Sequence, residues 1–237
     1  MHSVLANNRA IIITGGFGSG KSEYAINLAL ESASIDDLQT TIVDLDLVNA
    51  YFRSREAKDL LAKHGVNALV PSDDVFFSDL PIAGPGVRET IKNTDNRLIL
   101  DVGGDDMGAT ALASYCEDIS RIEHLMLMVV NPFRPFTKDI KGIEQMIVDI
   151  EYSSRLKIHG LISNPNIGPG TKLEQILDKH QVVIDAGKNF NLPVYELAIF
   201  KELYKKHSSE LDRMDIDIKP IEIYLSPQWL VKQLKED

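Results

Sequence analysis

The stretch TGGFGSGKSE, from Thr14 to Glu23, directly follows the apolar run AIIIT. It satisfies the pattern G-x-x-x-x-G-K-[ST], which is typical of a phosphate-binding loop between a buried strand and a helix. The next residues predict such a helix, because one stripe of it would carry Ala25, Leu28, Ala29 and Ser32. The alternative is a glycine-rich turn that matches by accident. Because both flanking elements are expected, phosphate binding is the better interpretation.

Each residue type in this loop has a chemical role. Glycines let backbone N–H groups surround phosphate oxygens, and the helix points the positive end of its dipole at them. We expect Lys21 to contact the β- and γ-phosphates and the Ser22 hydroxyl to bind Mg²⁺. The residues expected to contact the nucleotide here are Gly15, Gly16, Phe17, Gly18, Ser19, Gly20, Lys21 and Ser22.

A second apolar run, RLILDV, carries a carboxylate near its end. This carboxylate is Asp101, which can hold the ligand shell of Mg²⁺. Gly104 completes the pattern D-x-x-G, in which the glycine N–H can touch a γ-phosphate and so sense hydrolysis. The alternative is an ordinary acidic turn after a strand. Beside a phosphate loop, the metal-binding interpretation is the better one.

A third run, TTIVDLD, ends with Asp44 and Asp46, whose spacing points both carboxylates to the same side of an extended chain. We expect Asp44 to order the water shell of the metal and Asp46 to orient the attacking water, because phosphoryl transfer depends more on positioning than on a strong base. The alternative is a cap for the helix that begins near Ser54, but Ser54 itself can serve as that cap.

Apolar runs rich in β-branched residues alternate with helical patterns along the chain. Continuous apolar runs are typical of parallel strands that are covered on both faces. We therefore predict an α/β fold with a three-layer, doubly wound, mostly parallel sheet, formed by residues 1–237 as a single domain. A helix is expected over Lys138–Ser154. The predicted strands are Ala10–Thr14, Thr40–Asp46, Arg97–Val102, His124–Asn131, Lys157–Ser163 and Pro193–Ile199.

The composition excludes several classes of function. The 237 residues include 35 acidic and 25 basic side chains, for a formal net charge of −10. Such a charge repels nucleic acid and anionic lipid, so neither is an expected partner. No apolar run approaches the length of a membrane span. Cys116 is the single cysteine, which excludes an intrachain disulfide and a cysteine-based metal site. We expect a cytoplasmic protein.

Together these motifs resemble the MinD/ParA/CobQ-type branch of P-loop ATPases. The resemblance covers most of the chain, through GGFGSGKSEYAINLAL, TIVDLDLV, LILDVGGDD and GLISNPN. More closely, VDLDLVNAYFRSRE and VVNPFRPFT look like a group of MinD/ParA-like ATP-binding proteins of anaerobic bacteria. The resemblance implies ATP and Mg²⁺ as cofactors. It also implies Lys21 and Asp46 as catalytic residues, Ser22 and Asp101 at the metal, and Asn164 beside the base.

Gly16 departs from this resemblance, because these ATPases usually carry a signature lysine there that reaches the nucleotide of a dimer partner. With glycine at this position the chain lacks that contact between subunits, so the resemblance does not decide whether the protein forms a homodimer. Guanine-binding members of the wider superfamily use N-K-x-D, whose Asp accepts hydrogen bonds from the N1 and N2 protons of guanine. The corresponding NPNI, Asn164–Ile167, lacks that carboxylate, which favours ATP over GTP. The alternative for Asn164 is a turn residue before Pro165.

Three functions remain open at this point. The first is an ATP-hydrolysing molecular switch that acts on a protein partner. The second is a small-molecule kinase or ligase, in which Arg53, Arg55 and Arg134 would hold an acceptor anion. The third is a scaffold that binds nucleotide without turnover. The patterns D-x-D and D-x-x-G favour the first, because they couple the metal and the γ-phosphate to the segments that follow them.

Overall fold

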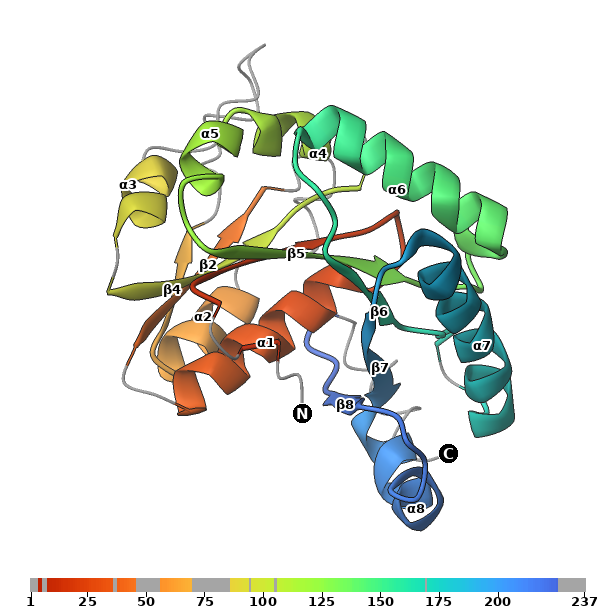
Figure 1. The fold of residues 1–237 in the computed structure, drawn as a ribbon. Coiled ribbons are helices and arrows are strands. Elements are labelled where there is room, and N and C mark those ends of the chain that lie inside the picture. The colour runs from red at the N-terminus through yellow and green to blue at the C-terminus, as the bar shows by residue number, and fades with distance from the viewer. Residues whose placement is uncertain are drawn as a thin grey trace.

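The computed structural model describes residues 4–5, 8–35, 38–45, 56–69, 86–93, 95–104, 106–168 and 170–225. Within these residues, eight strands form one sheet in the order β3-β2-β4-β1-β5-β6-β7-β8 (Figure 1). Every neighbouring pair of strands is parallel. The predicted α/β class with a doubly wound parallel sheet is therefore confirmed.

Strands and helices alternate along most of the chain. The strands are β1 (Ala10–Thr14), β2 (Gln39–Asp44), β3 (Val66–Leu69), β4 (Asn96–Asp101), β5 (His124–Val130), β6 (Gly160–Ser163), β7 (Val194–Phe200) and β8 (Ile218–Ile221). The helices are α1 (Lys21–Ile35), α2 (Glu56–Lys63), α3 (Val87–Lys92), α4 (Asp106–Ala113), α5 (Cys116–Ile119), the 3₁₀ turn η3 (Pro135–Thr137), α6 (Ile140–Ser154), α7 (Leu173–Phe190) and α8 (Lys201–Leu211).

Two apolar layers cover the two faces of the sheet. Successive side chains of a strand point to opposite faces, so Ala10 and Ile12 of β1 join one buried cluster and Ile11 and Ile13 join the other. Helices α1 and α2 pack on the second face, whereas α3, α4, α5, α6 and α7 contribute to the cover of the first (Figure 1). The result is the predicted three-layer arrangement, with the sheet in the middle.

The six strands predicted from apolar runs are all present, and two further strands lie at the edges of the sheet. The edge strand β3 reads VNAL and buries only Val66, and the edge strand β8 reads IKPI and buries only Ile221. Short, partly exposed strands and a proline are typical of sheet edges. Such strands lack the continuous apolar run on which the prediction depended.

The helix predicted over Lys138–Ser154 begins slightly later, at Ile140. Asp139 precedes it in an extended conformation, and its carboxylate accepts a hydrogen bond of 2.9 Å from the backbone N–H of Gly142. A short acidic side chain at this place satisfies one of the N–H groups that the first turn leaves without a partner. The cap therefore determines where α6 starts.

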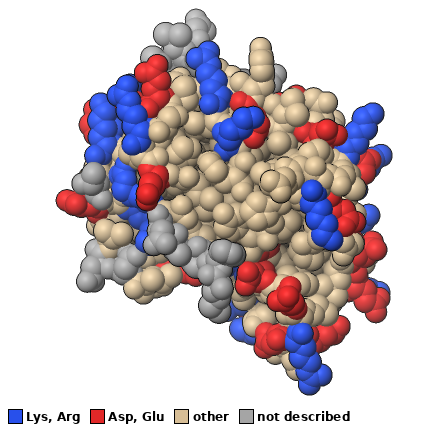
Figure 2. All heavy atoms as spheres, viewed as in Figure 1, with Lys and Arg blue, Asp and Glu red and all other residues tan. Residues whose placement is uncertain are grey.

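The surface carries charges of both signs. On the face shown in Figure 2, Lys and Arg side chains alternate with Asp and Glu side chains around the edge of the molecule. None of the helices in the described ranges is long and apolar enough to cross a membrane.

Candidate functional site

The strand order reverses at β1. The chain forms β2, β3 and β4 on one side of β1 and then crosses to β5 on its other side. In doubly wound sheets, ligands bind outside the carboxyl ends of the strands at such a point. The loop between Thr14 and Lys21 leaves β1 there, between the ends of β4 and β5.

This loop takes a shape that depends on its glycines, three of which have a positive φ, among them Gly15 at +149°. Gly18 has a φ of +72° and Gly20 a φ of +88°, a region that other residues rarely adopt. The backbone N–H of Ser19 donates to the carbonyl of Gly16 at 3.0 Å and closes a tight turn. Helix α1 then begins at Lys21, whose side chain is 6% exposed. The structure thus places the predicted phosphate loop at the N-terminus of a helix, where N–H groups are available to an anion.

Gly104 packs directly against the loop. A Cβ atom at this position would lie 2.4 Å from the carbonyl carbon and oxygen of Gly15, and 2.8 Å from the nitrogen of Gly16. Only a glycine lets two stretches of main chain approach so closely. The D-x-x-G segment and the phosphate loop, which are far apart in the sequence, are therefore in contact.

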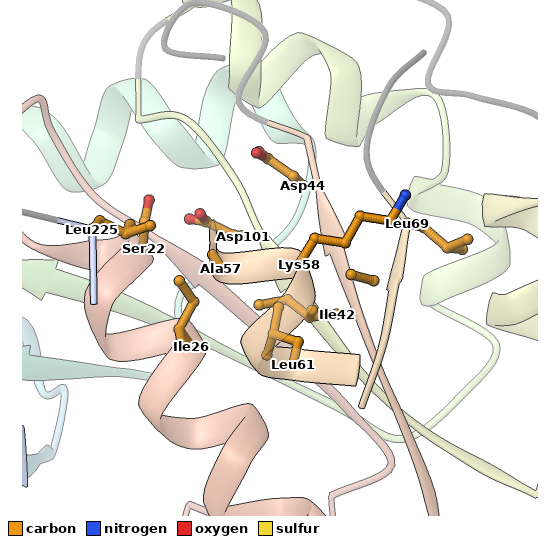
Figure 3. A pocket seen from close by; sticks show the side chains of 11 residues that line it. Ser22, Ile26, Ile42, Asp44, Ala57, Lys58, Leu61, Leu69, Asp101 and Leu225 are labelled. Atoms are coloured by element: carbon orange, nitrogen blue, oxygen red, sulfur yellow. The ribbon is translucent and has the colours of Figure 1, made fainter. Parts of the chain in front are cut away.

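The three predicted metal residues line one pocket. Asp44 and Asp101 are register partners at the carboxyl ends of β2 and β4, and Ser22 lies in the first turn of α1. All three line a pocket of about 400 Å³, counted together with the space open to solvent. Figure 3 shows the Asp101 carboxylate between Ser22 and Asp44. Residues from α2, among them Lys58, form the opposite side of this pocket.

These residues fit a magnesium ion bound together with phosphates. Mg²⁺ prefers oxygen ligands and usually takes one or two carboxylates with phosphate oxygens and water. Ser22, Asp44 and Asp101 supply a hydroxyl and two carboxylates. In the ranges that the structure describes, no cluster of three or more His, Cys, Asp or Glu side chains could hold a metal ion by itself. Phosphate oxygens and water would complete the shell.

A buried hydroxyl in the loop is also suited to an anion. The Ser19 side chain is 4% exposed, and its Oγ has no hydrogen-bond partner within the described part of the chain. Buried hydroxyl groups normally have a partner. Phe17, by contrast, is 83% exposed at the tip of the loop. We therefore assign a contact with the phosphates to its backbone and not to its side chain.

Asn164 lies beside the loop, where its side chain supports the backbone. Its Nδ2 donates a hydrogen bond of 2.6 Å to the carbonyl of Ser19, and it stands where a Cβ on Gly20 would fall, 2.2 Å away. The predicted contact of Asn164 with a base stays a prediction. Asp46, Arg53 and Arg55 lie outside the described residues.

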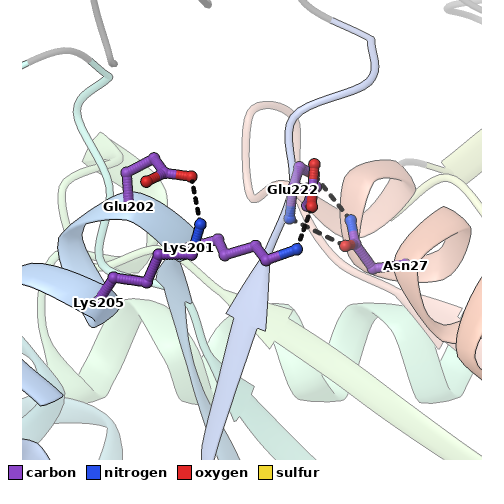
Figure 4. A network of polar contacts seen from close by, with 5 residues as sticks. All are labelled: Asn27, Lys201, Glu202, Lys205 and Glu222. Atoms are coloured by element: carbon purple, nitrogen blue, oxygen red, sulfur yellow. Dashed lines mark hydrogen bonds and ion pairs between the residues drawn. The ribbon is translucent and has the colours of Figure 1, made fainter. Parts of the chain in front are cut away.

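The C-terminal segment binds to the first two turns of α1. The Glu23 carboxylate accepts hydrogen bonds from the backbone N–H groups of Tyr224 and Leu225, at 3.0 and 2.7 Å. The Asn27 side chain pairs with both the N–H and the carbonyl of Glu222, and the Glu222 carboxylate pairs with Lys201 (Figure 4). Burial raises the pKa of Glu23 to about 7, although the hydrogen bonds from the backbone of Tyr224 and Leu225 act to lower it. Leu225 thereby becomes part of the pocket wall.

Sequence patterns do not point to every residue of the site. Leu225 reaches the pocket from the far end of the chain, and no local motif indicates this. Lys58 looks like any lysine on a helix surface. Asn131 carries a weak signal, because it is a polar residue at the carboxyl end of a buried strand, where ligands collect on such sheets.

The comparisons with known proteins support the fold. No protein-family model matches the chain, and no curated protein matches its sequence. Solved structures do match. FtsY from Mycoplasma mycoides has a TM-score of 0.54 at 15% identity, over 98% of this chain and 67% of that one. The cell division protein FtsY from Thermotoga maritima has a TM-score of 0.53 at 14% identity, over 97% and 69%.

A third structure is the signal recognition particle receptor FtsY from Elizabethkingia anophelis in complex with GDP. Its TM-score is 0.52 at 19% identity, over 84% of this chain and 60% of that one. At such identities the similarity shows the fold alone. The chain shares the α/β fold of these FtsY structures.

Proposed function

We propose that the protein binds a nucleoside triphosphate with Mg²⁺, hydrolyses it slowly, and acts as a molecular switch for a protein partner. The observation that carries the proposal is the pocket in which Ser22, Asp44 and Asp101 meet at the N-terminus of α1. A hydroxyl and two carboxylates beside a glycine loop form the donor set that a magnesium–triphosphate complex requires.

In this proposal different residues bind the phosphates, the metal and the attacking water. The N–H groups of the loop and the ammonium of Lys21 bind and orient the phosphates. Ser22, Asp44 and Asp101 would hold the metal, which would neutralise charge on the phosphate oxygens. Asp46 would orient the attacking water, as the sequence predicts, although it lies outside the described residues.

The contact of Gly104 with the loop supports a switch. In the D-x-x-G pattern this glycine would sense the γ-phosphate, and its main chain already touches Gly15 and Gly16. A change at the γ-phosphate would therefore act on the segment after β4 as well as on the loop. An excess of acidic over basic residues, 35 against 25, favours a protein rather than a nucleic acid as the partner.

The proposed relationship to MinD/ParA-type ATPases rests on the sequence motifs. The chain differs from these ATPases at Gly16, where they usually carry a lysine. In the structure, a Cβ at Gly16 would lie 2.7 Å from Cε of Met146 on α6. The side chain of Met146 occupies the space through which a lysine would leave the loop. We therefore expect a nucleotide site that works without a lysine supplied by a second subunit.

The proposed nucleotide is ATP. The segment Asn164–Ile167 has no carboxylate that could accept hydrogen bonds from guanine, although one structure of similar fold holds GDP. Competition of unlabelled ATP and GTP against a fluorescent ATP analogue decides between the two. We expect ATP to compete more strongly, and stronger competition by GTP would overturn the choice of base.

Phosphate release tests the reaction. We expect slow release from MgATP that Asp46→Asn abolishes while nucleotide binding is retained. Tight binding without any release would support the scaffold alternative instead. Rapid ATP consumption with a small acceptor, and a phosphorylated product in mass spectrometry, would support a kinase or ligase. The position of Arg134 does not support the kinase or ligase alternative, because this arginine contacts Gly18 and does not line the pocket where it would hold an acceptor.

A further inference from the structure

The segment after β5 is joined to the phosphate loop through Asn131. This side chain is 1% exposed, and its Nδ2 donates to the carbonyl of Asn166 at 2.7 Å and to that of Gly18 at 3.3 Å. Its Oδ1 accepts from the backbone N–H groups of Phe133 and Asn166, at 3.1 and 3.2 Å. One buried amide therefore connects the phosphate loop with the loops that follow β5 and β6.

Arg134 makes a second contact with the same carbonyl. Its Nε donates a hydrogen bond of 2.9 Å to the oxygen of Gly18. The guanidinium lies against the glycine itself, since a Cβ on Gly18 would be 2.8 Å from Nε and 3.0 Å from the guanidinium carbon. Apart from this contact the arginine is exposed. The Gly18 carbonyl thus receives two donors, one buried and one at the surface.

These contacts complete a pattern along the loop. The carbonyl of Gly16 accepts from the N–H of Ser19, and that of Gly20 accepts from the N–H of Tyr24. The carbonyls of Gly18 and Ser19 are held by side chains of Asn131, Arg134 and Asn164. A carbonyl oxygen turned toward a phosphate would repel it. In a trans peptide the N–H points away from the carbonyl, so a carbonyl that is held outward keeps the next N–H directed inward.

We propose that Arg134 is a positioning residue that acts through Gly18, together with Asn131 and Asn164, to hold the phosphate loop in its binding shape before nucleotide arrives. The active group is the Nε–H donor and not the positive charge. The inference rests on the proposed function, because it assigns these residues to the nucleotide site. The shape of the loop in nucleotide-free protein can be tested separately.

Two substitutions separate the donor from the charge. In Arg134→Gln the amide nitrogen stands at the same number of bonds from Cα as Nε, so the donor stays and the charge is lost. In Arg134→Lys a carbon stands there and the ammonium lies one bond farther from Cα, so the charge stays and the donor at the Nε position is lost. Arg134→Met loses both. Because Arg134 is exposed, all three variants should fold, and circular dichroism with thermal melting checks this.

The first measurement is the Kd for MgATP of the full-length protein and the three variants. A single hydrogen bond contributes a factor of about five in an equilibrium constant. We expect Arg134→Lys and Arg134→Met to bind about fivefold more weakly, and Arg134→Gln to stay within about twofold of the wild type. Wild-type affinity in Arg134→Lys would overturn the proposal, as would a loss in Arg134→Gln equal to that in Arg134→Met.

The second measurement is amide hydrogen exchange of the loop peptide in nucleotide-free protein. We expect faster exchange in Arg134→Lys and Arg134→Met than in the wild type or Arg134→Gln. If the wild type binds no nucleotide but these differences persist, the proposed function fails and the positioning role stands. If the wild type binds MgATP and exchange is the same in all variants, the positioning role fails and the proposed function stands.

Discussion

The phosphate loop is held in different ways on its two sides. Toward β4, the main chain of Gly104 lies directly against the main chain of Gly15 and Gly16. Toward β5 and β6, the loop carbonyls accept hydrogen bonds from side chains, one of which is the exposed Arg134 and another Asn164. We call these the glycine side and the side-chain side of the loop.

The difference determines how each side responds to change. Contact between two stretches of main chain has no flexible atom that can move away, so an added methyl group must displace the backbone. Hydrogen bonds from side chains can be removed one at a time, each with a modest effect. The glycine side includes Gly104, the proposed γ-phosphate sensor, which follows Asp101 by three residues. A rigid contact there would transmit a change at the γ-phosphate to the loop.

The strongest test of the glycine side is Gly104→Ala. The new methyl group would lie 2.4 Å from Gly15, so the loop must shift. We expect MgATP affinity to fall about 100-fold and the free energy of unfolding to fall by about 1 to 3 kcal/mol. Isothermal titration and chemical denaturation measure the two effects.

Gly16→Ala is the matched control for this substitution. Its methyl group would meet Cε and Sδ of Met146, the outer part of a flexible side chain. We expect a change in affinity of less than about threefold, because Met146 can take another rotamer. Equal losses in the two alanine variants would show that the main-chain contact of Gly104 has no special importance.

Asp101→Asn tests the metal on the same side of the loop. The amide keeps the shape but removes a charged oxygen that would bind Mg²⁺. We expect affinity for ATP in the presence of Mg²⁺ to fall about tenfold, and affinity in the presence of a chelator to change little. Asp149→Asn, an exposed substitution on α6, is the control. A loss that is the same with and without Mg²⁺ would exclude Asp101 from the metal site.

Asn164→Ala tests the side-chain side and also the predicted contact with a base. Its hydrogen bond to Ser19 supports the loop, so its loss should weaken inorganic tripolyphosphate, which has no base, as well as ATP. We expect a decrease of about fivefold for both ligands. If ATP alone is affected, Asn164 contacts the base and the support of the loop is unimportant.

Glu23→Gln should have the smallest effect on nucleotide affinity, within about twofold, and a clear effect on the pH dependence of stability. The native pKa of Glu23 is about 7 and its ordinary value is 4.5. Between these values the native state binds more protons than the unfolded chain, so this group makes the free energy of unfolding fall as pH rises. The contribution is complete below pH 4.5 and lost above about pH 7.

Denaturation of wild type and Glu23→Gln across this pH range isolates the effect, which is about 3 kcal/mol for a pKa difference of this size. His180 titrates in the opposite sense, because burial lowers its pKa from 6.5 to about 4. Since both proteins keep His180, its contribution cancels in the difference between them. A difference that does not vary with pH would show that Glu23 does not titrate in this range.

The comparison also shows what a sequence can and cannot predict. The loop residues, Asp44 and Asp101 belong to local patterns at the ends of apolar strands, so both the strands and the candidate ligands could be predicted together. The edge strands β3 and β8 could not, because partly exposed strands need no continuous apolar run. The bond between Arg134 and Gly18 joins residues 116 positions apart. Only the order of strands in the sheet brings them together.

The contact between Gly104 and Gly15 is an intermediate case. The D-x-x-G pattern indicates a role at the γ-phosphate, but no pattern shows that its main chain would touch the loop. The same holds for Glu23, which looks like an ordinary acidic residue in the first turn of a helix. Its partners lie 201 and 202 positions away, in the C-terminal segment.

The central claim is that the loop and the pocket beside it bind a magnesium–triphosphate complex. Calorimetric titration of the wild type and of Lys21→Ala with ATP, with and without Mg²⁺, tests it most directly. We predict saturable binding that Mg²⁺ strengthens, and a loss of about tenfold or more in Lys21→Ala, because a charge-assisted contact with the phosphates is removed. Absence of binding to the wild type, or equal affinity in the two proteins, would contradict the claim.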